Sequence, residues 1–249
     1  MLVVLPAPSA QIPASAGPLA ALLRANDHAL ATAIDRWNKT DLPPRDVTLL
    51  ALLRQRALRA LAVDRPLARA VVRRDPAIAT DVAAHTDLAR LAASGPVPRT
   101  GPRIGPAQPP LRLLAWYLGA QRSFGIRWQL LAAINFVESA FGKVRGTSTA
   151  GAQGPMQFEP ATWRAYGLGG DINDPHDAIF GAANYLAANR GARDERAALY
   201  HYDNSPLYVD AVERYANRIA GDRHAFFEYY AWQVYFRTSA GSRRVTGPR

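Results

Sequence analysis

Cysteine is absent from this sequence, which excludes disulfides, thiolate nucleophiles and cysteine-based metal sites. Lysine is scarce as well, because only Lys39 and Lys143 occur and every other basic residue is an arginine. No stretch approaches the ~20 consecutive apolar residues that a membrane-spanning helix needs. The chain does have 49% hydrophobic and 9% aromatic residues in 249 positions, which is ample for a packed core. Disorder is therefore not expected.

The net charge of +10 is unevenly distributed along the chain. Residues 1–110 carry 14 basic and 8 acidic side chains, and residues 221–249 carry 5 and 2. Residues 111–220 are nearly neutral, with 11 basic and 10 acidic side chains. A basic flank attracts polyanions such as a wall polymer, a membrane surface or nucleic acid. A solvated basic surface explains the same surplus, and we expect no nucleic-acid partner.

Residues 1–94 are predicted to form an N-terminal helical unit. Apolar side chains recur there at helical spacing, without a competing strand pattern, in residues 18–37, 46–63, 66–74 and 76–93. Residues 95–110, GPVPRTGPRIGPAQPP, form a Pro/Gly-rich connector with little capacity for regular structure. This connector is the predicted domain boundary.

The rest of the chain also has the pattern of helices and loops, so the predicted fold class is all-α. Asp174-Pro175 and Ser205-Pro206 are typical helix starts, since each places a capping side chain before a proline at the first helical position. Aromatic residues from Phe226 to Phe236 predict a last helix that packs as core, followed by a basic tail, within residues 221–249. At most a small hairpin is expected, in residues 143–153. The remaining helices are expected in residues 111–125, 126–139, 175–189, 194–202 and 206–219.

One acidic residue stands in an otherwise apolar helical stretch. Leu130, Ile134, Val137 and Phe141 recur at helical spacing, and Glu138 lies at the edge of the stripe they form. A carboxyl group among apolar neighbours loses hydration, which disfavours the ionised form and raises its pKa. Such a group can act as a general acid near neutral pH.

Three motifs occur in order from this glutamate onward. They are VES at 137–139, followed by Ser148, then GAQGPMQF at 151–158, and ALYHYDNS at 198–205. Their order, spacing and residue types resemble the lytic transglycosylase domain of bacterial wall remodelling, an SLT-type domain with a lysozyme-like fold. The resemblance is closest to secreted actinobacterial forms. It covers residues 111–220, which we therefore predict to be a lysozyme-like catalytic domain.

The resemblance implies non-hydrolytic cleavage of the MurNAc–GlcNAc β-1,4 bond of peptidoglycan. Glu138 matches the family's sole catalytic acid, which gives a proton to the leaving oxygen. The substrate's own N-acetyl group assists, Glu138 then acts as a base, and the 6-hydroxyl closes a 1,6-anhydro ring. No second enzyme carboxylate is needed, and no cofactor or metal is expected.

Other motif residues are predicted to line the glycan cleft. Gly151 and Gly154 let the backbone bend where a side chain would block the sugar. Met156 offers a pliable apolar wall, and Gln157 offers a donor and acceptors for a sugar amide or hydroxyl. Ser148 matches a serine near the acid, although a loop-capping hydroxyl would explain it equally well.

The third motif contains a departure from the family pattern. Tyr202 matches the tyrosine that contacts the catalytic glutamate, but Asp203 stands where the family has asparagine. An amide can donate to a carbohydrate, whereas an ionised carboxylate can only accept. Either Asn204 takes over this role, or Asp203 alters the sugar contacts or the pKa of Glu138.

Two alternative functions remain open. A hydrolase of the same fold would use water as the acceptor, and Glu159 is a second carboxylate that could activate it. We expect Glu159, however, to face solvent or form a salt bridge. A non-catalytic glycan-binding protein is the other alternative, and Asp203 in place of asparagine raises it.

No metal site is predicted. The acidic run Asp171, Asn173, Asp174 and Asp177 lacks the spacing of a calcium loop, so we expect it to cap a helix. The histidines are scattered without metal-ligand spacing.

A wall substrate implies an extracytoplasmic location, with peptidoglycan glycan strands as the partner of a monomeric protein. The opening MLVVLPAPSAQIPASAG has a short apolar run but lacks the basic region of a signal peptide. It fits either the remnant of a trimmed export signal or a flexible terminus, so we expect the signal or anchor to lie outside this chain. The basic flanks predict peripheral contact with an anionic wall polymer or membrane surface.

Overall fold

The computed structural model describes residues 5–95, 97 and 101–248, and it confirms the all-α fold class. Residues 1–4 of the predicted export remnant, and residues 96 and 98–100 of the connector, lie outside this description. Within the described ranges, no helix is both long and apolar enough to span a membrane. The helices are α1 (Ala16–Arg36), α2 (Arg45–Val63), α3 (Arg65–Arg74), the 3-10 turn η1 (Pro76–Ile78), α4 (Ala79–Ser94), α5 (Pro110–Phe124), α6 (Trp128–Ser139), α7 (Pro160–Tyr166), α8 (Pro175–Ala188), α9 (Glu195–Tyr202), α10 (Pro206–Gly221) and α11 (Ala225–Ala231).

Helix starts in the second half of the chain confirm the predictions from local sequence. At the start of α8 the Asp174 carboxylate accepts hydrogen bonds from the backbone N–H groups of His176 (2.8 Å) and Asp177 (3.1 Å). At the start of α10 the Ser205 hydroxyl accepts one from Tyr208 N–H (3.4 Å). Each cap satisfies N–H groups that have no partner within the helix. The acidic run therefore caps a helix, as expected.

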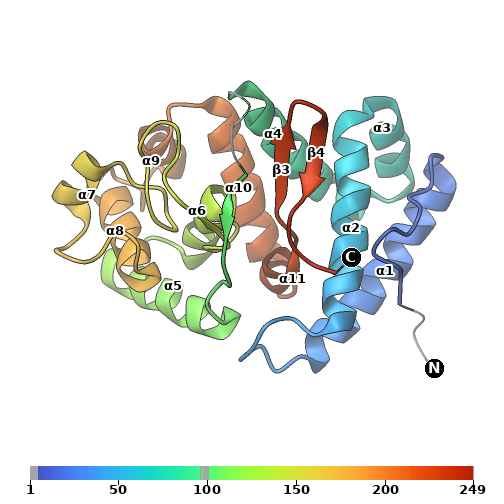
Figure 1. Ribbon diagram of the computed structural model, residues 1–249, viewed down its shortest axis with the longest axis horizontal. Helices are drawn as coiled ribbons and strands as arrows, with labels where there is room; N and C mark the ends of the chain where they lie inside the picture. The colour runs from blue at the N-terminus through green and yellow to red at the C-terminus, as the bar shows by residue number, and fades with distance from the viewer. Residues whose placement is uncertain (1–4, 96, 98–100, 249) are drawn as a thin grey trace.

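The helices before and after the connector share one apolar core. Figure 1 shows α1–α3 at one end of the molecule, α5 and α7–α9 at the other, and α10 and α11 between them. Helix α10 packs against both α4 and α6, and α11 packs against α2. The division into units at residues 95–110 stays a prediction, but the two sides are held together by buried contacts.

A buried ionic cluster crosses this contact. The Arg54 side chain of α2 is only 2% exposed and pairs with Asp27 (2.8 Å), Asp81 (2.9 Å) and Glu228 (2.7 Å). Arg218 of α10 forms a second pair with Asp81 (2.8 Å). Burial opposes ionisation of Asp81, but the two guanidinium groups hold its pKa below the usual value. The cluster joins α1, α2, α4, α10 and α11.

The connector has more structure than predicted. Its residues Arg103–Ile104 form strand β1, which pairs antiparallel with β2 (Val144–Arg145). A strand therefore exists in residues 143–153, but its partner is the connector and not the same loop, which corrects the predicted hairpin. The backbone N–H of Gly105 extends the pairing by donating to Lys143 C=O (2.9 Å). Pairing satisfies backbone groups that an isolated extended segment would leave to water.

The C-terminal helix is shorter than predicted. Helix α11 ends at Ala231, and its aromatic residues are buried as expected, except Phe227, which is half-buried and packs against the core. The last two aromatic residues of the run, Tyr235 and Phe236, belong to strand β3 (Tyr235–Thr238), which forms a hairpin with β4 (Gly241–Arg244). The prediction of a helix up to Phe236 is therefore wrong, and part of the basic tail forms strand β4. The Arg59 guanidinium lies 3.9 Å from the centre of the Tyr235 ring, a contact between distant parts of the chain that a local pattern cannot reveal.

Candidate active site

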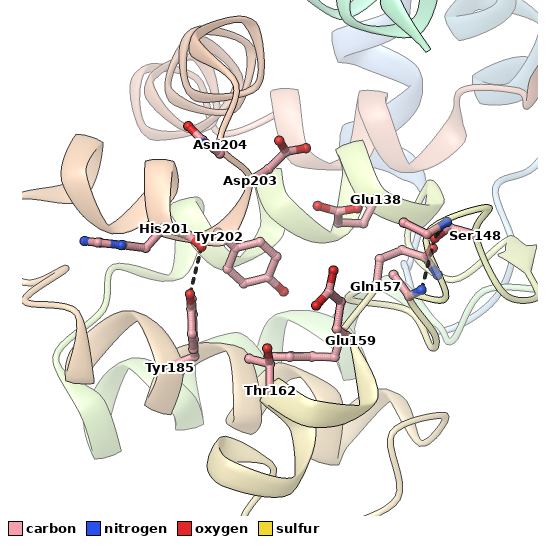
Figure 2. Close-up of a pocket in the computed structure, with 13 residues that line it drawn as sticks. Glu138, Ser148, Gln157, Glu159, Thr162, Tyr185, His201, Tyr202, Asp203 and Asn204 are labelled. Atoms are coloured by element: carbon pink, nitrogen blue, oxygen red, sulfur yellow. Dashed lines mark hydrogen bonds between the residues drawn. The ribbon is translucent and has the colours of Figure 1, made fainter. Parts of the chain in front are cut away.

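One cavity of about 470 Å³ brings together most of the predicted site residues. It lies between the end of α6, the loop that follows β2, the start of α7, and α8 and α9 (Figure 2). The sequence predicted catalytic or substrate-binding roles for Glu138 and for residues of the motifs that follow it. Six of them line this cavity, namely Glu138, Ser148, Gln157, Tyr202, Asp203 and Asn204.

Glu138 is held in place by the end of helix α6. Asn135 and Ser139, both buried on the same helix, donate hydrogen bonds to the carbonyl oxygen of Pro155, at 2.8 and 2.6 Å. The hydroxyl of Tyr117 on α5 donates to the Asn135 side-chain oxygen (2.6 Å). These buried bonds join α5, α6 and the following loop. They fix the position from which the Glu138 carboxyl group enters the cavity.

The environment of Glu138 favours its protonated form. Loss of hydration on burial raises its pKa to about 8, and the nearby charge of Asp203 acts in the same direction. The Tyr208 hydroxyl, which favours the ionised form, opposes the shift only in part. At pH 7 a group with this pKa is about nine-tenths protonated. The carboxyl group therefore has a proton to give at neutral pH.

Asp203 faces the same space as Glu138. Figure 2 shows the Asp203 carboxyl group above that of Glu138, whereas the Asn204 side chain points away from Glu138. Burial raises the pKa of Asp203 as well. The charge of Asp203 raises the pKa of Glu138, which is one of the consequences that the sequence left open, and Asp203 and Asn204 both line the cavity where a sugar contact would occur.

Tyr202 contacts the backbone beside the glutamate. Its hydroxyl donates to the carbonyl oxygen of Met156 (2.7 Å), and its ring lies parallel to that of Tyr208 at 6.3 Å between centres. The bond ties α9 to the loop that carries Gln157. Gln157 has a positive φ of 49°, and its side-chain amide donates to Gly154 C=O (2.8 Å). The Tyr202 contact thus stabilises the conformation that presents Gln157 to the cavity.

Ser148 caps its own loop. Its hydroxyl oxygen accepts from the backbone N–H groups of Ala150 (3.2 Å) and Ala152 (3.0 Å). The loop-capping alternative is therefore present in the structure. The hydroxyl also lines the cavity, where its proton remains a donor for a bound sugar.

Met156 and Gly154 do not line the cavity that contains Glu138. Met156 is 0% exposed, and the cavity wall does not include it, so it packs beneath the site and is not an apolar wall. A Cβ atom on Gly154 would lie 1.8 Å from the carbonyl oxygen of Ile172, and Gly154 has a φ of 76°. The glycine makes room for a neighbouring backbone segment and not for a sugar. These observations correct the predicted roles of Met156 as an apolar wall of the cleft and of Gly154 as space for the sugar.

Gly154→Ala is predicted to destabilise the fold. The added methyl group would overlap the Ile172 carbonyl and force an unfavourable backbone angle, so we expect a loss of about 1–3 kcal/mol in the free energy of unfolding. Urea denaturation measures it. Gly17→Ala is the matched control, because open space surrounds Gly17 within helix α1. Equal stability of the two variants would contradict the packing role of Gly154.

Several residues of the site carried no clear signal in the sequence. Tyr208, in the first turn of α10, approaches Glu138 only because α10 packs behind α6, and Tyr185 and His201 reach the cavity from α8 and α9. Glu159 is exposed, as expected, and has no ion-pair partner among the described residues. It nevertheless lines the cavity, and Figure 2 shows its carboxylate directed into it. Thr162 lies beside it on α7.

Two comparisons relate this geometry to known proteins. Residues 117–224 match the family described as "Transglycosylase SLT domain". The chain is also similar to "Membrane-bound lytic murein transglycosylase F" of Thiobacillus denitrificans (strain ATCC 25259 / T1), with 30% identity over 115 residues. That similarity covers 43% of this chain and 24% of the relative, so the chain spans about a quarter of the relative's length. Glu138, Asp203 and the other cavity residues all lie inside the matched family segment.

Proposed function

Since residues 117–224 of this chain match the transglycosylase SLT family, we propose that the protein cleaves the MurNAc–GlcNAc β-1,4 bond of peptidoglycan and leaves 1,6-anhydro-MurNAc ends. Glu138 is the proposed general acid and base. The observation that carries this proposal is the Glu138 carboxyl group, which is protonated at neutral pH and enters a cavity lined by the motif residues.

In the first step Glu138 acts as an acid. Its proton passes to the glycosidic oxygen while the bond from that oxygen to C1 of MurNAc breaks, and GlcNAc leaves with a free hydroxyl group. The carbonyl oxygen of the substrate's N-acetyl group bonds to C1, and the developing positive charge is delocalised over the ring that this bond closes. Glu138 is left as a carboxylate.

In the second step Glu138 acts as a base. The carboxylate takes the proton of the 6-hydroxyl, whose oxygen bonds to C1 and displaces the N-acetyl oxygen. The product is the anhydro ring, and Glu138 has regained its proton. The raised pKa suits both steps, because a group with a pKa near the working pH gives and accepts a proton at similar cost.

A hydrolase of the same fold is the second candidate, and Glu159 is the observation that favours it. A carboxylate across the cavity from an acid can activate water in glycoside hydrolysis. The mass of the products separates the two candidates, because an anhydro end is lighter than a reducing end by one water. Mass spectrometry of fragments from purified peptidoglycan is expected to show anhydro ends. Reducing ends alone would establish the hydrolase, and bound glycan without fragments would establish a binding protein.

The proposed substrate places this protein outside the cytoplasm, at the cell wall, as a monomer acting on glycan strands. The basic flanks of the chain suit peripheral contact with an anionic wall polymer or membrane surface. Gel filtration at several ionic strengths, with and without isolated wall, tests both the monomeric state and this contact.

Asp203→Asn is expected to change the pH dependence of cleavage. The charge of Asp203 raises the pKa of Glu138, so its removal lowers that pKa. The protonated acid is then lost at a lower pH, and the alkaline limb of the pH–rate profile shifts toward lower pH. A profile measured from pH 5 to 9 detects the shift. Asp41→Asn, the same charge change at an exposed position in another part of the chain, should leave the profile in place.

A further inference from the structure

A second cavity, of about 310 Å³, lies beside the β1–β2 ladder. Arg103 of β1 and Arg145 of β2 line it, together with polar side chains that can donate hydrogen bonds, Gln108, Thr147 and Asn173. No carboxylate is among the residues that line it, and within the described parts of the chain neither arginine has an ion-pair partner. The cavity therefore offers positive charge and hydrogen-bond donors without a counter-charge.

The two arginines are directly opposite each other across the strands. Arg103 pairs with Arg145 in the register of the ladder. Like charges in this position repel each other and weaken a strand pair that is only two residues long. An anion between the two guanidinium groups would remove the repulsion.

The Arg145 side chain is held in position by its surroundings. Its guanidinium donates to the carbonyl oxygen of Pro106 (2.9 Å). It also occupies the space above Gly105, where a Cβ atom would lie 2.4 Å from its Cζ and Nε atoms. Any larger residue at position 105 would displace the guanidinium. The connector thus orients Arg145 beside the cavity, which is a form of preorganisation for a ligand.

One loop separates this cavity from the candidate active site. Gly146 and Thr147 line the second cavity, and the next residue, Ser148, lines the first. The two cavities therefore flank the same turn of chain. A ligand that extends from the glycan cleft past this turn reaches the arginines.

We propose that this second cavity binds a carboxylate group, and that the group belongs to the peptide stem of the glycan strand bound in the cleft. The choice of the stem rests on the proposed function, because peptidoglycan strands carry carboxylate-bearing peptides. Arginine binds carboxylates through two parallel hydrogen bonds, so two arginines and three polar neighbours form a suitable set of donors. The cavity makes the protein selective for strands that retain their peptides.

Binding to the Glu138→Gln variant tests the proposal without turnover. Isothermal titration calorimetry compares a GlcNAc–MurNAc disaccharide carrying a tetrapeptide, the same disaccharide without peptide, and glycerol phosphate. We expect the peptide-bearing ligand to bind about tenfold more tightly than the peptide-free ligand. Adding Arg103→Gln and Arg145→Gln should bring this ratio close to one.

Two further variants separate a positioned site from general positive charge. Gly105→Ala keeps the net charge but displaces the Arg145 guanidinium, so it should also lower the ratio. Arg69→Gln removes one exposed positive charge on α3 and should leave the ratio unchanged. A parent ratio of one, or a ratio that the double arginine variant does not alter, would overturn the proposal. Glycerol phosphate binding that depends on the arginines, without peptide selectivity, would overturn the carboxylate assignment.

The product assay keeps this proposal distinct from the proposed function. Anhydro ends formed from peptide-bearing and peptide-free glycan alike, with no difference in affinity, would leave the function standing and remove the second site. Selective binding of the peptide-bearing ligand without any cleavage would support the second site and contradict the proposed function.

Discussion

Replacing Glu138 with glutamine is expected to reduce peptidoglycan cleavage by about 10²–10⁴-fold, the range typical of a lost general acid. Glutamine keeps the size of the side chain and cannot deliver a proton to the leaving oxygen. The rate of release of soluble fragments from purified wall measures the effect. Cleavage at an undiminished rate would show that Glu138 is not the acid.

The fold of this variant provides its own control. Burial raises the pKa of Glu138 to about 8, so the folded state holds a proton that the unfolded chain releases at lower pH. The stability from this proton is complete below the unfolded pKa and is lost as pH rises through about 8. Glutamine removes that dependence, and the variant should be at least as stable as the parent at alkaline pH. Thermal unfolding at pH 6 and pH 9 tests this.

Glu159→Gln distinguishes the two possible chemistries of the same cavity. The transglycosylase reaction needs no second enzyme carboxylate, so this variant should still form anhydro ends. A loss of cleavage as large as that of Glu138→Gln would indicate that Glu159 activates water. Glu138→Gln therefore tests whether Glu138 is the general acid, and Glu159→Gln tests whether the reaction is a transglycosylation or a hydrolysis.

Arg54→Ala is expected to lower the free energy of unfolding by about 3–5 kcal/mol, the usual result of breaking a buried charge network from one side. Arg54 contacts three carboxylates, at 2.7–2.9 Å, and is 2% exposed. Its removal leaves the buried Glu228 and the partly exposed Asp27 without their main counter-charge. Burial already raises the pKa of both. Urea denaturation at neutral pH measures the loss.

The pH dependence identifies the cause of that loss. Without the guanidinium, the folded-state pKa values of Asp27 and Glu228 rise further above their unfolded values, so the deficit should shrink as the pH falls toward 5. Arg54→Lys keeps one charge but cannot reach three partners at once, and it should lie between the parent and Arg54→Ala. Arg69→Ala, at an exposed position of α3, should change stability little. A loss below about 1 kcal/mol for Arg54→Ala would mean that the cluster contributes no more than a surface pair.

Short sequence motifs predicted the helix starts, because the hydrogen bonds that cap a helix join residues that are close together in the chain. Asp174 and Ser205 cap helices because a side-chain oxygen and an N–H group two or three residues later are brought together by the helix itself. The aromatic run from Phe226 to Phe236 contains no such signal, since aromatic residues suit both helices and strands. Its division between α11 and β3 depends on where Tyr235 meets Arg59 and on a turn at Gly241, which has a φ of 114°.

The connector is a second segment whose structure local sequence did not predict. Its prolines and glycines disfavour a helix, and its described residues form none before Pro110, where α5 begins. They do not exclude pairing with a distant strand, and residues 103–104 find one in β2. A short strand needs a partner whose position is decided by the rest of the fold.

By itself the sequence determined the helical class, the helix starts, and one carboxyl group in an apolar stretch followed by the residues of three motifs. These features depend on the spacing of residues that are close together in the chain, and that spacing can be read directly from the sequence. Only the tertiary structure decided that Asp203 and Glu138 share one cavity, that Tyr208 approaches Glu138 from α10, and that Gly154 makes room for the Ile172 carbonyl. It also decided that two arginines oppose each other beside a second cavity. The reason is physical: hydration, charge and close packing depend on neighbours in space, and those neighbours are distant in the chain.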